Sequence, residues 1–187
     1  KEFQSDLEQY LSVKHVIPCA NGTDALQIAL MALAIKPGDE VIVPAFTYAA
    51  SAEVIGLLGA VAVWCDVNES TFTIDPDSVK SVLSDKTAAI IAVHLYGQCA
   101  DIEALESCAP GIPIVEDTAQ AFGAAFTAGK YVGRHAGTGQ RLSVVFMSLP
   151  DEPDSALAVY SDTLPDRYHD SYMEAIESNE GQSTNNL

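Results

Sequence analysis

The sequence is short of positive charge. Only 9 of its 187 residues are lysine or arginine, against 26 aspartate and glutamate residues, and the formal net charge is -17. So acidic a chain repels nucleic acid and anionic lipid surfaces, and we expect neither as a partner. No apolar run approaches the roughly 20 residues that a bilayer span needs, and no secretory signal opens the chain. These absences predict a cytoplasmic protein. The chain does not begin with methionine, so we expect that the true N-terminus is missing.

Cysteine and histidine are also scarce. The sequence holds four of each, and no two cysteines form a CxxC pair. The histidines lack ligand spacing with one another or with the cysteines, so no metal site is expected. We interpret the cysteines as reduced, mostly buried side chains of a cytosolic protein.

Short apolar runs alternate with helical patterns along the chain. Runs that predict strands cover 14–19, 41–43, 61–67, 88–94 and 113–116; patterns that predict helices cover 3–11, 25–35, 48–58, 76–83 and 101–108. Strands that are apolar throughout and separated by helices are typical of a largely parallel sheet covered on both faces. We therefore predict an α/β fold of three layers. Ligands of such sheets bind at the carboxyl ends of the strands.

The turn Asn21-Gly22-Thr23-Asp24 lies between a predicted strand and a predicted helix. Its amides and the Thr23 hydroxyl form a natural seat for a phosphate at a helix N-terminus. A glycine turn with a capping threonine is also a common structural feature, so this motif by itself leaves both readings open.

Two further strand ends carry residues of interest. Asp117 directly follows a buried strand, where a carboxylate costs free energy unless a cation pairs with it. A protonated pyridine nitrogen would supply that cation; alternatively, Asp117 caps the following turn. Tyr48 could stack on a flat heterocycle or belong to the core.

In order, the chain reads N-G-T-D-A-L, G-D-E-V-I-V-P-A-F-T-Y, H-L-Y-G-Q and V-E-D-T-A-Q-A-F-G. From about Phe3 to Gly133 this succession resembles the DegT/DnrJ/EryC1/StrS aminotransferases. The resemblance implies the large domain of a fold-type-I transferase dependent on pyridoxal 5'-phosphate (PLP), incomplete at both ends. It also implies a homodimer with its site at the interface, working in sugar or polysaccharide biosynthesis. In this family glutamate donates an amino group to a keto group on a nucleotide-linked sugar.

The same resemblance assigns roles to individual residues. Thr23 and Asp24 would hold the PLP phosphate by their backbone amides, and Thr23 also by its hydroxyl. Ser143, in the short match L-S-V-V-F, would contact the phosphate as well.

Around the ring, Tyr48 would stack on one face, Asp117 would pair with the pyridine nitrogen, and Gln120 would approach the ring hydroxyl. His94 and Tyr96 lie in a matching segment, and the resemblance gives them no role.

The family's lysine is missing. In the family a serine-aromatic-aromatic strand leads, five residues on, to the lysine that bonds to PLP, and Ser148 falls in that slot here. Lys130 is the last lysine of the chain. Because serine can neither form a Schiff base nor shuttle the substrate proton, we expect weak, non-covalent PLP binding and no transamination.

We divide the chain into a family-like PLP-binding part (1–133), a divergent continuation (134–150) and an acidic, poorly ordered tail (151–187). The abrupt change of pattern favours a truncated or frame-shifted product of an aminotransferase gene. A second reading is a genuine lysine-less homologue that binds PLP or a nucleotide sugar without transaminating. A third is a shared fold with a dinucleotide cofactor, supported only by Gly137-Thr138-Gly139.

Overall fold

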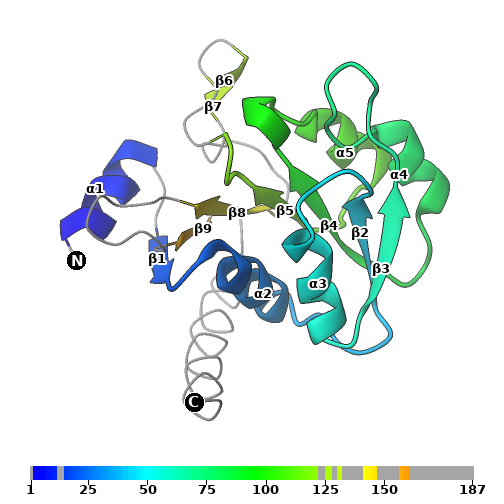
Figure 1. The fold of residues 1–187 in the computed structure, drawn as a ribbon, viewed down its shortest axis with the longest axis horizontal. Helices are drawn as coiled ribbons and strands as arrows, with labels where there is room; N and C mark the ends of the chain where they lie inside the picture. The colour runs from blue at the N-terminus through cyan, green and yellow to red at the C-terminus, as the bar shows by residue number, and fades with distance from the viewer. Residues whose placement is uncertain are drawn as a thin grey trace.

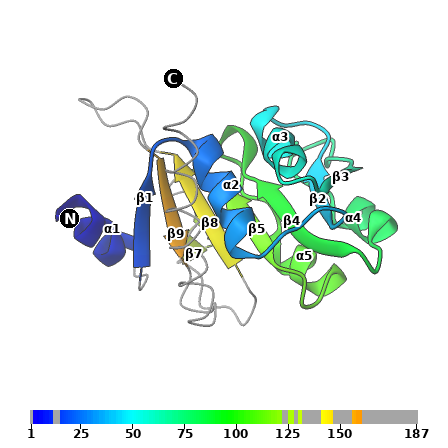
Figure 2. The ribbon, with the colours of Figure 1, turned by 90° about the horizontal axis from the view of Figure 1, so that it is seen from below.

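The computed structural model describes residues 2–11, 15–121, 125–127, 130–131, 141–146 and 156–160. These residues build a seven-stranded sheet with helices on both faces (Figures 1 and 2). The helices are α1 (Glu2–Leu11), α2 (Gly22–Ala32), α3 (Ala50–Leu57), α4 (Pro76–Val82), α5 (Ile102–Cys108) and the 3-10 turn η1 (Leu95–Gly97). The strands are β1 (His15–Cys19), β2 (Glu40–Pro44), β3 (Val61–Cys65), β4 (Thr87–Val93), β5 (Ile114–Asp117), β6 (Ala125–Thr127), β7 (Lys130–Tyr131), β8 (Arg141–Phe146) and β9 (Ala156–Tyr160).

The strand order in the large sheet is β1-β9-β8-β5-β4-β2-β3. Strands β3, β2, β4, β5 and β8 pair in parallel, whereas β9 is antiparallel to both of its neighbours, β1 and β8. The prediction of an α/β fold with a mainly parallel sheet is therefore confirmed. Strands β6 and β7 form a separate antiparallel pair.

Alternation along the central strands creates two hydrophobic cores. Val41, Ile91 and Val115 pack in one cluster together with residues of α2 and α3. Their neighbours Ile42, Ile90 and Ile114 pack in the other cluster, with residues of α4 and α5. Because successive side chains of a strand point to opposite faces, the continuous apolar runs seen in the sequence serve both faces.

Two predicted helix starts are confirmed in detail. The Asp75 side chain accepts a hydrogen bond from Asp77 N (3.1 Å), and Pro76 follows as the first residue of α4. The Asp101 side chain accepts from Ala104 N (3.0 Å) at the start of α5. Each carboxylate satisfies an amide that has no acceptor within its own helix.

One part of the tail prediction is wrong. Ala156–Tyr160 lies in the segment expected to be poorly ordered, yet it forms β9 and separates β1 from β8 in the sheet. The acidic composition of 151–187 as a whole conceals a five-residue apolar run, A-L-A-V-Y, that has the length and character of a buried strand. The other residues of 151–187 are outside the described ones.

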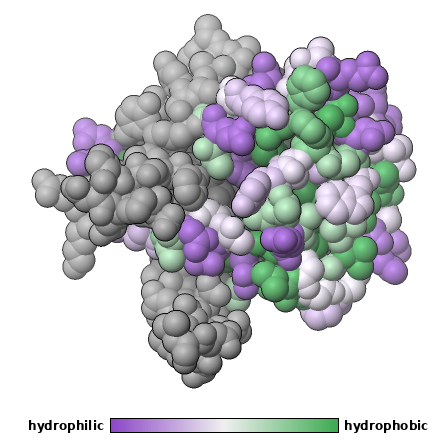
Figure 3. Space-filling model, viewed as in Figure 1, coloured by the Kyte–Doolittle hydropathy of each residue, from purple (hydrophilic) through white to green (hydrophobic). Residues whose placement is uncertain are grey.

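The surface seen in Figure 3 mixes hydrophobic and hydrophilic residues over the described part of the chain. None of the helices that the structure describes is both long and apolar enough to cross a membrane. The four cysteines, all in the described part of the chain, form no disulfide with one another. Burial raises the pKa of the Cys19 and Cys65 thiols to about 12, so both are protonated at neutral pH and are poor nucleophiles.

Candidate cofactor-binding site

The segments that follow β1, β2 and β4 meet the end of β5 around one cavity of about 380 Å³. Four of the six residues that the family resemblance singles out line it: Thr23, Tyr48, Asp117 and Gln120. They come from three separate segments of the sequence, since Asp117 and Gln120 are three residues apart. The parallel sheet brings them together at the edge where ligands of such folds bind.

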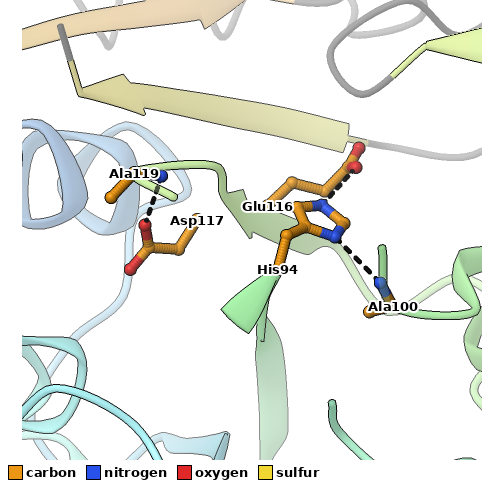
Figure 4. Close-up of polar contacts among 5 residues, drawn as sticks. All are labelled: His94, Ala100, Glu116, Asp117 and Ala119. Atoms are coloured by element: carbon orange, nitrogen blue, oxygen red, sulfur yellow. Dashed lines mark hydrogen bonds and ion pairs between the residues drawn. The ribbon is translucent and has the colours of Figure 1, made fainter. Parts of the chain in front are cut away.

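Asp117 is the last residue of β5 and its side chain is buried, at 8% exposure. Its Oδ1 accepts a hydrogen bond from Ala119 N (3.1 Å, Figure 4), and its Oδ2 accepts one from Ser51 Oγ (3.3 Å). Burial raises the pKa of this carboxyl group, and the hydrogen bonds from Ala119 and Ser51 only partly oppose that rise. Within residues 16–121 no lysine or arginine forms an ion pair with Asp117. This part of the chain therefore holds a buried carboxylate beside a cavity and supplies no lysine or arginine to pair with it.

The start of α2 forms another wall of the cavity. Asn21 is its N-cap residue and is followed by Gly22 and Thr23, and all three line the cavity. The first amides of a helix have no acceptor within it, so those of Gly22 and Thr23 can donate to an anion. The Thr23 hydroxyl adds a further donor.

Asp24 does not fit its expected role in this arrangement. Its amide donates to Asn21 Oδ1 (2.9 Å), and its Oδ2 accepts from Asn21 Nδ2 (3.0 Å). The Asp24 amide is already bonded to the side chain of Asn21, which caps the helix. It can donate to a phosphate only if that side chain moves. The sequence motif offers its amides as a seat for a phosphate. The cap formed by Asn21, the residue before Gly22, occupies one of them, the amide of Asp24.

Gln120 lines the cavity and accepts a hydrogen bond from Tyr96 N at its Oε1 (2.6 Å). Because a backbone N–H can only donate, the atom facing it must be the amide oxygen of Gln120. The Nε2 group remains as a donor. An ionised ring hydroxyl of PLP would accept a hydrogen bond from such a donor.

Tyr48 lies in the loop after β2 and its side chain is 76% exposed. An exposed residue that also lines the cavity lies at its mouth. Close by, Thr47 Oγ1 and Ser51 Oγ lie 3.4 Å apart, linking this loop to the first turn of α3.

His94 and Glu116 form a buried pair that the sequence analysis left without a role. His94 Nε2 lies 3.0 Å from Glu116 Oε2, and the two side chains are 1% exposed or less (Figure 4). His94 Nδ1 accepts a hydrogen bond from Ala100 N (2.9 Å), so Nε2 carries the proton that is donated to Glu116. The sequence offered one signal for this pair: a histidine directly after one buried strand and a glutamate inside the next strand.

Two further residues were considered from the sequence. Ser143 lies in β8, where its backbone is in register with Glu116, next to the pair Val144 and Asp117. Ser148 is outside the described residues. Among the side chains that the structure describes, no three His, Cys, Asp or Glu groups gather to hold a metal ion.

The strand order defines the class of fold: the chain has the architecture of the large domain of fold-type-I PLP-dependent transferases. The structure matches 3-amino-5-hydroxybenzoic acid synthase with a TM-score of 0.80 and 29% identity, over 92% of this chain and 45% of that one. It also matches the PLP form of Spr1654 from Streptococcus pneumoniae, assigned as a sugar aminotransferase, with a TM-score of 0.76 and 28% identity over 93% and 48% of the two chains.

The family follows from the sequence comparison. Residues 1–145 match the model of the DegT/DnrJ/EryC1/StrS aminotransferase family, and the chain belongs to that family. It is 50% identical to UDP-2-acetamido-2-deoxy-3-oxo-D-glucuronate aminotransferase of Pseudomonas aeruginosa over 127 residues. This aligned segment covers 67% of this chain and 35% of the relative. The chain thus spans about a third of the length of that relative.

The structural likeness reaches further along the chain than the family model does. The family model ends at residue 145 of 187, whereas the structural matches cover 92% and 93% of the chain. Some residues beyond 145 therefore take part in the shared fold, in agreement with the place of β9 in the sheet.

Proposed function

We propose that this chain binds PLP in the cavity at the end of β5, without a covalent bond to it. The observation that carries the proposal is the Asp117 carboxylate, buried beside the cavity and bonded, among the described side chains, to a backbone amide and a hydroxyl. A protonated pyridine nitrogen would supply the missing cation and lower the pKa that burial raises. The amides and hydroxyl at the start of α2 would hold the phosphate, and Tyr48 and Gln120 would contact the ring.

When bound, PLP supplies an electron sink that transamination requires. The chain's own contribution would be to hold the ring nitrogen protonated through Asp117, to donate to the ring hydroxyl from Gln120 Nε2, and to seat the phosphate on Gly22 and Thr23. None of these groups is a base placed to move the substrate proton.

We propose further that this chain does not transaminate. In the family the reaction passes an amino group from glutamate to a keto group on a nucleotide-linked sugar, in a cytoplasmic homodimer. The lysine that performs its proton transfers has no counterpart after Lys130 in the sequence. The family model matches residues 1–145, which argues against a reading in which everything after residue 133 is unrelated to the family.

Absorption spectroscopy tests both parts of this proposal. Titration with PLP should give a saturable spectral change that dialysis removes, and borohydride should fix no cofactor to the chain. A pyridoxyl group found by mass spectrometry on one lysine, at one equivalent, would contradict non-covalent binding. The absence of any saturable change would contradict the PLP site itself.

The missing lysine favours one second candidate, a binding protein for nucleotide sugars. Such a protein would keep the cavity and dispense with turnover. Calorimetric titration with a UDP- or dTDP-sugar distinguishes the two: measurable affinity without amino transfer, and no affinity for PLP, would favour the second candidate. Sequencing the parent gene across residues 133–149 in all three frames would test the frame-shift reading, since an S-F-F-x-x-K motif in another frame supports it.

A further inference from the structure

We infer that His94 and Glu116 are positioning residues that fix the orientation of the Gln120 amide at the cavity. This inference rests on the proposed PLP site, because Gln120 is there the donor to the ring hydroxyl. Neither His94 nor Glu116 lines the cavity. Their influence would pass through the loop that connects β4 to α5.

The first step of the argument concerns the His94 ring. It is held at both nitrogens, by Glu116 Oε2 at 3.0 Å and by the Ala100 amide at 2.9 Å (Figure 4). A ring bonded at both ends in a buried place has one orientation and one tautomer. The bond to Ala100 closes the loop of residues 94–100 onto its own first residue.

The second step concerns what this closed loop does. Tyr96 has a φ of 57° and Gly97 a φ of 80°, both in the left-handed region. A left-handed conformation is uncommon for tyrosine and persists when surrounding contacts determine it. The closed loop turns the Tyr96 N–H toward Gln120 Oε1, at 2.6 Å.

The third step concerns the other side of the junction. The His94 N–H donates to Asp117 O at 3.0 Å, and Val93 is in register with Asp117. A Cβ atom on Gly97 would lie 3.4 Å from Gln120 O, so the loop rests closely on the segment after β5. The loop and the two cavity residues Asp117 and Gln120 are thus joined at several points, and the His94–Glu116 pair anchors the loop from the opposite face of the sheet.

Two substitutions separate the two bonds of the imidazole. In His94→Asn the side-chain oxygen can occupy the place of Nδ1 and still accept from Ala100, but the donor to Glu116 is lost. In His94→Gln the amide can occupy the place of Nε2 and still donate to Glu116, but the acceptor for Ala100 is lost. Each variant serves as the matched control of the other.

Amide hydrogen exchange tests the inference without any cofactor. We expect His94→Gln to lower the protection of the Tyr96 amide by about tenfold, the equivalent of one hydrogen bond. His94→Asn should lower it by less. Unchanged protection at Tyr96 in His94→Gln would overturn the inference, and so would an equal loss throughout β4 and β5, because that would be general destabilisation.

A double-mutant cycle on PLP affinity adds a second readout. His94→Gln should weaken PLP binding about threefold to tenfold in the unsubstituted chain and have no effect in the background of Gln120→Ala. Equal effects in both backgrounds would overturn the inference. If the unsubstituted chain binds no PLP, the proposed function fails, while the exchange experiment still decides the role of His94.

Discussion

Glu116 and Asp117 are neighbours in β5, both are buried, and they lie on opposite faces of the sheet. Glu116 meets the imidazole of His94 at 3.0 Å, and that imidazole is itself bonded to the Ala100 amide. Asp117 meets a backbone amide and a serine hydroxyl, and beyond them a cavity. Glu116 thus has a histidine partner, whereas Asp117 meets only neutral donors among the described side chains.

The comparison shows how a buried charge can be interpreted. Moving a carboxylate from water into a protein costs several kcal/mol, which hydrogen bonds from neutral donors only partly offset. Where a carboxylate is buried beside a cavity at the carboxyl ends of parallel strands and has no cationic partner, a positively charged ligand is favoured there. Burial alone does not distinguish the two acids; the partner and the open space beside it do.

The largest expected effect breaks the Asp117 side of the comparison. Asp117→Asn keeps the shape of the side chain and removes its charge, so a protonated ring nitrogen loses its partner. We expect PLP affinity to fall about 10-fold to 100-fold, the worth of a hydrogen bond between charged groups. The same substitution should raise the melting temperature of the ligand-free protein, because it removes a buried charge.

Asp85→Asn is the control for this experiment, since it removes a charge from an exposed turn. It should change neither PLP affinity nor melting temperature. If Asp117→Asn binds PLP as tightly as the unsubstituted chain, Asp117 is not the partner of the ring.

The next effect breaks the Glu116 side. Glu116→Ala leaves the buried Nε2–H of His94 without its acceptor, so we expect the free energy of unfolding in urea to fall by about 1–3 kcal/mol. The opposite signs predicted for Asp117→Asn and Glu116→Ala sharpen the comparison, and Asp85→Ala provides the exposed control. A Glu116→Ala protein as stable as this control would show that the pair contributes no net stability.

The sequence predicted the arrangement around Asp117 better than that around Glu116. The sequence showed that Asp117 follows a buried strand and that a turn at Asn21 precedes a helix. Because the carboxyl ends of parallel strands meet at one edge of the sheet, these two positions could be expected to lie close together. The bond from Ala119 N agrees with the alternative that Asp117 caps the following turn. The partner Ser51 was not visible, because the hydrogen bonds of a side chain to distant residues depend on rotamers and loop paths that periodicity does not encode. The pairing of His94 with Glu116 needs the register between β4 and β5, which sequence alone does not give.

The same limit explains the error over β9. Its five apolar residues carry a strand signal, but the acidic residues around them dominate any average over the tail. What makes Ala156–Tyr160 a strand of the sheet is the pair of neighbours, β1 and β8, between which it lies. Such non-local pairing overrides local composition.

The third prediction concerns pH. Burial raises the pKa of Asp117 in the folded protein above its ordinary value of 3.8. Between the two pKa values the folded state binds more protons than the unfolded one, so this residue lowers stability as pH rises through that window. Above the folded pKa the cost is fully present, and below the ordinary value it is absent.

Urea denaturation of the unsubstituted chain and of Asp117→Asn, measured from about pH 3 upward, isolates this contribution. The stability advantage of Asp117→Asn should be near zero at the acid end, grow with pH and then level off. An advantage that shrinks as pH rises would mean that Asp117 is stabilised as a carboxylate by a partner in the ligand-free protein, and the contrast with Glu116 would disappear.

The smallest effect sharpens the contrast at a single hydrogen bond. Ser51 Oγ donates to Asp117 Oδ2 over 3.3 Å, and the serine is buried. In Ser51→Ala that donor is lost, so the pKa of Asp117 should rise further and PLP affinity should fall about twofold to fivefold, as expected for one long hydrogen bond from a neutral donor. Ser107→Ala, on the exposed side of α5, is the matched control and should change neither quantity. Because a cation on Asp117 dominates over a hydroxyl, the loss in Ser51→Ala should be well below that in Asp117→Asn; an equal loss would mean that the hydroxyl, and not the ring nitrogen, is what keeps Asp117 ionised.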